Sequence, residues 1–203
     1  KRKLIILFTL LICSFEAYSL SFMSYNVENL FDNLHDEGKS DEAYLPLKHK
    51  AKKACASISN KYYRGECEKT DWTSEKIEQK LSNIKEVIDS ASVKPDFLAV
   101  IEVENDPILK ALGKKLKYSD FISTHSPDER GVDVALYYHA SKDLKLISVE
   151  ELELKEGMKK PTRNILIGKF SYKGSDLFAI VNHWPSQGAP TEVRGSVAKK
   201  LRE

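Results

Sequence analysis

The chain has 203 residues, and its 32 Lys and Arg residues nearly balance its 30 Asp and Glu residues. This length suits one large domain or two small ones and allows a sizeable core. The near balance of charge excludes the global positive field that marks many nucleic-acid-binding proteins. Three cysteines are too few for a disulfide scaffold and do not form a zinc-binding pattern.

The first 19 residues have the pattern of a secretory signal peptide. Residues 1–3 are basic, residues 4–15 are largely apolar, and Ala17-Tyr18-Ser19 fits a small-x-small cleavage site. The apolar stretch is shorter than a membrane-spanning helix, although an uncleaved N-terminal anchor is the alternative. We therefore expect a mature chain that starts at Leu20, has no stable membrane anchor, and is periplasmic or secreted. Its 29 basic and 29 acidic residues give it no net charge.

Two cysteines, Cys55 and Cys67, remain in the mature chain. In an exported protein such a pair is more often a disulfide than two free thiols. Both lie within residues 32–71, a polar stretch that is too long for an ordinary connection between two elements. The sequence therefore predicts a surface excursion that a Cys55–Cys67 disulfide holds together.

Two apolar strands are predicted on either side of a helix. Residues 20–27 have apolar side chains in both alternation phases, which predicts a central strand that ends near Asn26. Residues 97–103 form a second apolar run, which ends at Glu102. Residues 75–90 place apolar side chains at helical spacing between them. A strand, a helix and a strand in this order favour two neighbouring parallel strands.

Shorter elements follow. Asp106-Pro107 predicts the start of a second helix with Asp106 as its N-cap, as Thr73 is for the first. Lys173-Gly174 predicts the turn of an antiparallel hairpin. The remaining predicted elements are an extended segment at 118–125, strands at 132–139, 144–154, 164–171 and 177–182, and a helix at 192–203.

Polar side chains end three of these strands: Asn26, Glu102, and Asn182 with His183. Ligands of α/β proteins often bind at the carboxyl ends of strands. Hard cations such as Mg²⁺ take oxygen ligands, often one or two carboxylates with substrate phosphate. His183 can exchange a proton near neutral pH, and Arg163 can bind a phosphate group in bidentate fashion. Each of these residues also has a non-functional interpretation. Glu102 can be a solvent-exposed carboxylate at the end of a strand, Asn26 can be a turn residue, and His183 can have a purely structural role.

Four segments carry distinctive motifs. They are Ser24-Tyr25-Asn26-Val27-Glu28-Asn29-Leu30, the run from Pro95-Asp96 to Glu102-Val103, Arg130-Gly131-Val132-Asp133-Val134-Ala135-Leu136, and Val181-Asn182-His183-Trp184-Pro185-Ser186. In this order they resemble successive motifs of the endonuclease/exonuclease/phosphatase superfamily, which has the fold of deoxyribonuclease I. The resemblance implies an α/β fold, a four-layer sandwich of two mixed or antiparallel sheets flanked by helices.

The same resemblance implies a cation site beside a phosphate site. Glu102 matches the residue that holds a magnesium-type cation, with Asn26 nearby, and Mn²⁺ or Ca²⁺ is an alternative ion. Arg163 matches an arginine that precedes a strand and contacts phosphate. Asn182 would contact the phosphate as well.

His183 matches the family's first catalytic histidine, which assists the leaving oxygen. Asp133 falls roughly where some members keep an acidic partner for that histidine, although it can equally cap a strand. Tyr137 or Tyr138 could approach the phosphate, and both can equally belong to the core.

Two motifs of the family's second half, Gly-Asp-x-Asn and Ser-Asp-His, do not occur in this sequence. We therefore expect residues 20–203 to be the N-terminal portion of the domain, truncated at the C-terminus, with about half of a catalytic site and little turnover by itself. The function expected of the full-length protein is that of an exported, metal-dependent phosphodiesterase, chiefly an endonuclease that cleaves DNA or RNA as a monomer. The alternatives are a lipid phosphodiesterase or a phosphomonoesterase of the same fold, and a non-catalytic binding member.

Overall fold

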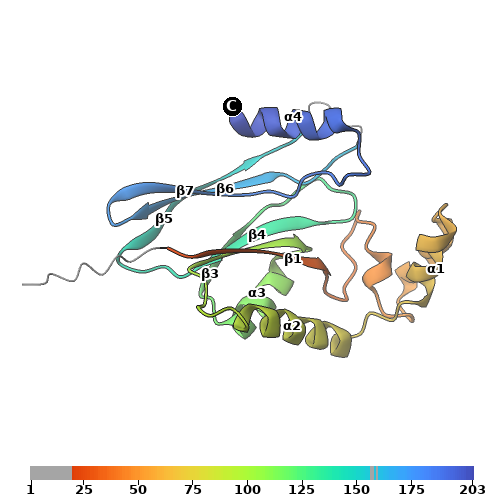
Figure 1. Ribbon diagram of the computed structural model, residues 1–203. Helices are drawn as coiled ribbons and strands as arrows, with labels where there is room; N and C mark the ends of the chain where they lie inside the picture. The colour runs from red at the N-terminus through yellow and green to blue at the C-terminus, as the bar shows by residue number, and fades with distance from the viewer. Residues whose placement is uncertain (1–19, 156–157, 159) are drawn as a thin grey trace, which may run out of the picture.

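The computed structural model describes residues 20–155, 158 and 160–203 (Figure 1). The predicted signal peptide, residues 1–19, lies outside these residues. None of the helices in the described part combines the length and apolar character needed to cross a membrane.

The first sheet contains four strands in the order β1-β2-β4-β3. They are β1 (Phe22–Leu30), β2 (Phe97–Val103), β3 (Asp120–Ser123) and β4 (Asp133–Tyr138). Strand β1 runs parallel to β2, which confirms the neighbouring parallel pair, and β4 runs antiparallel to both β2 and β3. The sheet is therefore mixed, as expected.

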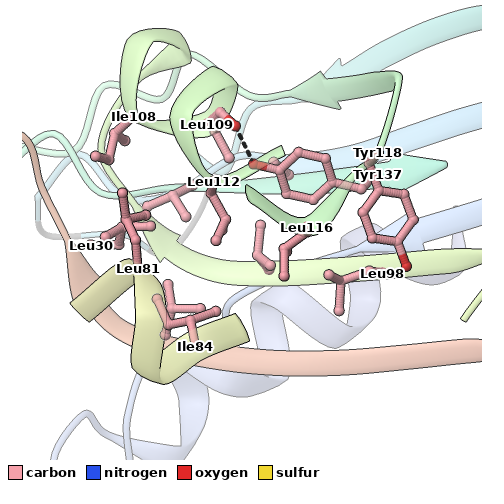
Figure 2. Packing of buried hydrophobic residues seen from close by; sticks show 14 of the residues in the cluster. Leu30, Leu81, Ile84, Leu98, Ile108, Leu109, Leu112, Leu116, Tyr118 and Tyr137 are labelled. Atoms are coloured by element: carbon pink, nitrogen blue, oxygen red, sulfur yellow. Dashed lines mark hydrogen bonds between the residues drawn. The ribbon is translucent and has the colours of Figure 1, made fainter. Parts of the chain in front are cut away.

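Two helices, α2 (Ser74–Asp89) and α3 (Asp106–Leu116), cover the outer face of this sheet (Figure 1). Their apolar faces pack on the sheet in one large cluster, where the Tyr137 hydroxyl donates a hydrogen bond to the Leu109 carbonyl (Figure 2). Thr73 caps α2 as predicted. The predicted cap of α3 is wrong, because Asn105 rather than Asp106 accepts the hydrogen bond from the Ile108 N–H.

The second sheet contains three antiparallel strands in the order β5-β6-β7. They are β5 (Leu144–Leu152), β6 (Ile165–Tyr172) and β7 (Ser175–Val181). The predicted hairpin turn joins β6 to β7, and both Lys173 and Gly174 have positive φ angles, as a tight turn of this kind requires. Helix α4 (Thr191–Arg202) covers the outer face and packs Val197 against Ile165 and Leu154.

The inner faces of the two sheets pack against each other. Phe97 and Tyr138 of the first sheet meet Phe170 of the second edge to face, with ring centroids 5.0 and 5.1 Å apart. The layers are therefore α2 and α3, the first sheet, the second sheet and α4 (Figure 1). This is the predicted four-layer sandwich.

Strand β1 lies at an edge of its sheet among the described residues, and not in the centre as predicted. Both of its faces nevertheless have apolar contacts. Val27 and Leu30 enter the cluster beneath α2 and α3, while Phe22 stacks on Phe97 with ring centroids 4.6 Å apart. The apolar residues in both alternation phases of β1 therefore reflect apolar contacts on both faces of the strand. They do not indicate a second neighbouring strand.

The excursion after β1 contains three short helices: the 3₁₀ segments at Glu42–Tyr44 and Lys50–Ser57, and α1 (Lys61–Lys69). A disulfide joins Cys55 to Cys67, whose Cα atoms are 5.7 Å apart. Stacking of Tyr44 on Phe31, with ring centroids 4.0 Å apart, attaches the excursion to the end of β1. Figure 1 shows α1 at the same end of the molecule as the arrowhead of β1.

Candidate active site

The candidate site lies where β1 and β2 lose their regular pairing. The pairing register shifts between Asn26 and Leu30 on β1, and around Glu102 on β2. Glu102 has a φ of 67°, and Glu28 and Asn29 have φ values of 53° and 60°. Positive φ at a non-glycine residue costs about 1–3 kcal/mol and is concentrated at functional sites. These irregularities turn Glu102 out of the regular pleat of β2.

Asn26 holds the Glu102 carboxylate in place. Its side-chain nitrogen donates a hydrogen bond of 3.0 Å to Oε1 of Glu102. Its amide oxygen accepts a hydrogen bond of 2.8 Å from the Glu28 N–H. Asn26 therefore orients Glu102, and the Glu28 N–H occupies one of the two lone pairs of its amide oxygen.

His183 follows β7 of the second sheet, and its imidazole lies next to the Glu102 carboxylate of the first sheet. Its Nε2 lies 3.6 Å from Oε1 of Glu102. Its Nδ1 is buried and has no hydrogen-bond partner among the described residues. Burial and the nearby Arg163 guanidinium lower the pKa of His183, while Glu102 acts in the opposite direction. The imidazole is therefore neutral near pH 7, so one ring nitrogen carries a proton and the other can accept one.

Arg163 precedes β6 and is held by two oxygen acceptors. Its Nη1 lies 3.5 Å from Oδ2 of Asp128, and its Nη2 donates to the Trp184 carbonyl at 3.5 Å. Its Nε is buried without a hydrogen-bond partner in the described part of the chain. Burial lowers the pKa of the guanidinium, which remains charged at neutral pH. A buried cation with an unused donor is suited to binding an anion.

Asp128 is a site residue that the sequence analysis missed. Its Oδ1 accepts hydrogen bonds from the backbone N–H groups of Arg130 and Val132, so it closes the turn before β4. The turn itself was visible in the Pro127-to-Gly131 sequence. The pairing with Arg163 was not visible, because it joins segments 35 positions apart and depends on the packing of the two sheets.

Asn182 lies between β7 and His183 and lines a cavity of about 340 Å³ along the edges of β1 and β7. No hydrogen bond within the described residues joins its side chain to Glu102, His183 or Arg163. The structure therefore places Asn182 beside the site without connecting it to the other predicted residues.

Asp133 is not brought to His183. Its Oδ1 accepts hydrogen bonds from the Thr124 hydroxyl at 2.6 Å, from the Ser126 N–H at 2.9 Å and from the Ser126 hydroxyl. Burial raises the pKa of Asp133. The expected partnership with the histidine is corrected to a structural role, in which Asp133 ties β4 to the segment after β3.

The two tyrosines of β4 belong to the core. Tyr137 is 1% exposed in the cluster beneath α3, and Tyr138 packs on Phe170 between the sheets. Strand β4 is fully buried, so alternate side chains point into one interior or the other. Neither phenol is directed at the site.

Glu102 is the carboxylate of the site that could hold a cation. No group of three or more His, Cys, Asp or Glu side chains in the described part of the chain is arranged to hold a metal ion. Mg²⁺ often binds through one or two carboxylates while water and substrate phosphate fill its other positions. One oriented carboxylate near an arginine that is suited to binding an anion fits that mode of binding.

Comparison with known proteins identifies the family. The Endonuclease/Exonuclease/phosphatase family model matches residues 21–199. No curated protein sequence matches the chain significantly.

Two solved structures show the same fold. An endonuclease/exonuclease/phosphatase family protein from Bacteroides thetaiotaomicron is 16% identical over 90% of this chain and 54% of its own, with a TM-score of 0.53. ANGEL2, described as a 2',3'-cyclic phosphatase in complex with adenosine-2',3'-vanadate, is 14% identical over 90% of this chain and 46% of its own, with a TM-score of 0.56.

The chain spans about half the length of the solved structures it matches. Identities this low establish the fold and not the substrate. The family match extends over most of the chain, from the start of β1 into α4, and includes every residue of the candidate site. The chain therefore belongs to the endonuclease/exonuclease/phosphatase family, whose members are hydrolases that act on phosphoester bonds.

Proposed function

We propose that the complete protein containing this chain is an exported, divalent-metal-dependent phosphodiesterase that cleaves DNA or RNA. One observation supports the proposal most directly. Glu102, His183 and Arg163 come from three separate segments and converge at one end of the two sheets, with Glu102 Oε1 3.6 Å from the imidazole. A carboxylate that can hold a cation, a neutral imidazole and a buried guanidinium are among the groups that hydrolysis of a phosphate ester uses.

Each residue has a distinct role in the proposed reaction. Glu102, oriented by Asn26, would hold the cation, which supplies charge stabilisation at a phosphoryl oxygen when it is bound. Arg163 would bind non-bridging oxygens of the phosphate through its guanidinium group. His183, neutral because of burial, would donate a hydrogen bond from its one imidazole N–H to an ester oxygen. The attacking water also requires a base, and none of the residues described above is assigned that role.

Nucleic acid is the proposed substrate class. The neighbouring structure of ANGEL2 contains adenosine-2',3'-vanadate, a nucleoside derivative, in a protein of the same fold. The balanced charge of the mature chain provides no strong long-range attraction for a polyanion, so affinity would come from contacts at the site. The experiment below tests this proposal against three alternatives: lipid phosphodiesters as substrates, phosphomonoesters as substrates, and a purely binding role.

The proposed location is the periplasm or the extracellular space, and the proposed state is a monomer. The signal-peptide pattern of residues 1–19 supports export. The Cys55–Cys67 disulfide is consistent with it, since disulfides persist in oxidising compartments.

The test is a nuclease assay on the complete gene product. Plasmid DNA is incubated with Mg²⁺, with EDTA, and with a Glu102→Ala variant, and Glu150→Ala on the exposed part of β5 serves as the control. Cleavage that requires the metal, is lost in Glu102→Ala and is kept in Glu150→Ala supports the proposal. Absence of cleavage by the folded protein overturns the DNA nuclease and directs the search to RNA, phospholipids and phosphomonoesters. Inactivity on those as well would leave a binding protein.

A further inference from the structure

A second pocket, of about 450 Å³, adjoins the candidate site and shares Arg163 and Asp128 with it. Its volume is within the range of about 300–1,000 Å³ typical of small-molecule sites. Three segments form it: the turn before β4, the residues that precede β6, and the loop from Pro185 into the start of α4. We call it the proline pocket.

Apolar side chains form one part of the lining of the proline pocket. They are Met158, Pro161, Pro185, Ala189, Pro190 and Val193. Proline and alanine lose almost no side-chain entropy when a ligand is bound against them. The other lining residues are polar or charged: Asp128, Glu129, Arg130, Lys160, Thr162 and Arg163. The proline rings suit the face of a flat ring, and the polar side chains suit hydrogen-bonding groups on its edge.

The polar end of the pocket is also the phosphate end of the candidate site. Arg163 is held there by Asp128 and has a buried, unused Nε. Arg130 stands beside them, with its Nε 3.7 Å from Oδ1 of Asp128 and half of its side chain exposed. Arg163 also donates a hydrogen bond to the carbonyl of Trp184, the residue after His183, so the pocket adjoins the segment that carries the imidazole.

These positions constrain how a substrate would lie. A phosphate against Arg163 therefore lies near His183 and Glu102 on one side and near the proline walls on the other. We infer that the proline pocket binds the nucleobase of a nucleotide ester whose phosphate lies against Arg163. The inference rests on the proposed function, because it assigns the substrate class of the same site.

Binding of small ligands tests this without requiring turnover. The complete gene product, with Mg²⁺ present, is titrated calorimetrically with thymidine 5'-monophosphate, a hexose 6-phosphate and inorganic phosphate. We expect the nucleotide to bind about fivefold more tightly than the other two, which is the lower end of what stacking one base on an aromatic side chain contributes, because proline rings and not aromatic rings line this pocket.

Two variants of α4 test whether the higher affinity for the nucleotide arises in the proline pocket. Val193→Trp fills the pocket from the first turn of the helix and should reduce the affinity for the nucleotide to that for phosphate. Gly195→Trp adds the same side chain two residues on, where a Cβ meets no atom within 4 Å, and should leave all three affinities unchanged. Circular dichroism and thermal unfolding verify that both variants fold.

The outcomes separate the two proposals. Equal affinity for phosphate and nucleotide, or a nucleotide affinity that Val193→Trp does not change, overturns the proline pocket and leaves the phosphoesterase intact. Tight binding of the hexose phosphate overturns the assignment to a nucleobase. If none of the three ligands binds to the folded protein, the phosphate site fails and the pocket fails with it.

Discussion

The buried carboxylate of Asp128 lies 3.5 Å from Nη1 of Arg163, and the two side chains are 8% and 13% exposed. This ion pair connects the turn before β4 of one sheet to the start of β6 in the other. It holds the guanidinium at the junction of the proposed phosphate site and the proline pocket. Asp128 is thus a positioning residue for Arg163.

Replacing Asp128 by Asn should weaken phosphate binding and stability together. The amide oxygen of Asn can still accept from the Arg130 and Val132 N–H groups, so the turn is kept while the charge is lost. Leaving a buried cation without its partner costs up to about 3–5 kcal/mol, and partial exposure of this pair favours the lower end. Urea unfolding and phosphate titration measure the two effects, with the exposed Glu150→Gln as the control. Wild-type values of both would contradict the assigned role.

Replacing Asn26 by Ala should weaken metal binding. The substitution removes the 3.0 Å hydrogen bond that orients Glu102 but leaves the carboxylate itself. Loss of a residue that orients a metal ligand typically costs about 10–100-fold in metal affinity. Calorimetric titration with Mg²⁺ and Mn²⁺ measures this, and Asn83→Ala on the exposed face of α2 is the control. If Mg²⁺ affinity is unchanged in Asn26→Ala, Glu102 is positioned by other contacts.

Glu104 makes stability depend on pH. Burial raises its pKa from 4.5 to about 8, and the nearby Asp32, Asp36 and Asp41 act in the same direction. The folded state thus holds a proton that the unfolded state releases above pH 4.5, so this contribution is complete below pH 4.5 and is lost as the pH rises towards 8. Each pKa unit corresponds to about 1.4 kcal/mol, which gives a total of a few kcal/mol.

The Glu104→Gln variant should therefore unfold at a higher temperature than the wild type at pH 9 and at a similar temperature at pH 5. Its amide oxygen can still accept the hydrogen bond from the Asp32 N–H. Thermal unfolding followed by circular dichroism at both pH values tests this, with the exposed Glu150→Gln as the matched control. An equal shift at both pH values would show that the effect does not come from ionisation.

The Cys55–Cys67 disulfide should stabilise the excursion without contributing to the site. It joins two buried sulfur-bearing residues 12 positions apart, and closing a loop of about this length stabilises a protein by about 2–3 kcal/mol. The double variant Cys55→Ser, Cys67→Ser should lose this amount in urea unfolding while keeping its affinity for phosphate. Dithiothreitol should lower the stability of the wild type and leave the variant unchanged. Equal stability of the wild type and the double variant in the absence of dithiothreitol would contradict the prediction.

Local sequence was sufficient for elements that are stabilised by their own residues. The helix after Thr73 follows from apolar spacing and a capping hydroxyl, and the hairpin at Lys173-Gly174 follows from turn chemistry. Glu102 and His183 were visible as polar groups that end apolar strands, because burial of the strand leaves only its end open to a ligand.

Tertiary structure decided what the polar side chains do. Asp128 and Asp133 occur five residues apart and look alike in sequence. In the folded chain, however, Asp128 forms an ion pair with Arg163, whereas Asp133 accepts hydrogen bonds from two hydroxyl groups. Strand β1 has the apolar pattern of a central strand and yet lies at an edge of its sheet in the described residues. In each case the sequence by itself determined the chemistry available at a position, whereas contacts between distant segments determined its environment, because charge pairing and burial depend on separation in space and not along the chain.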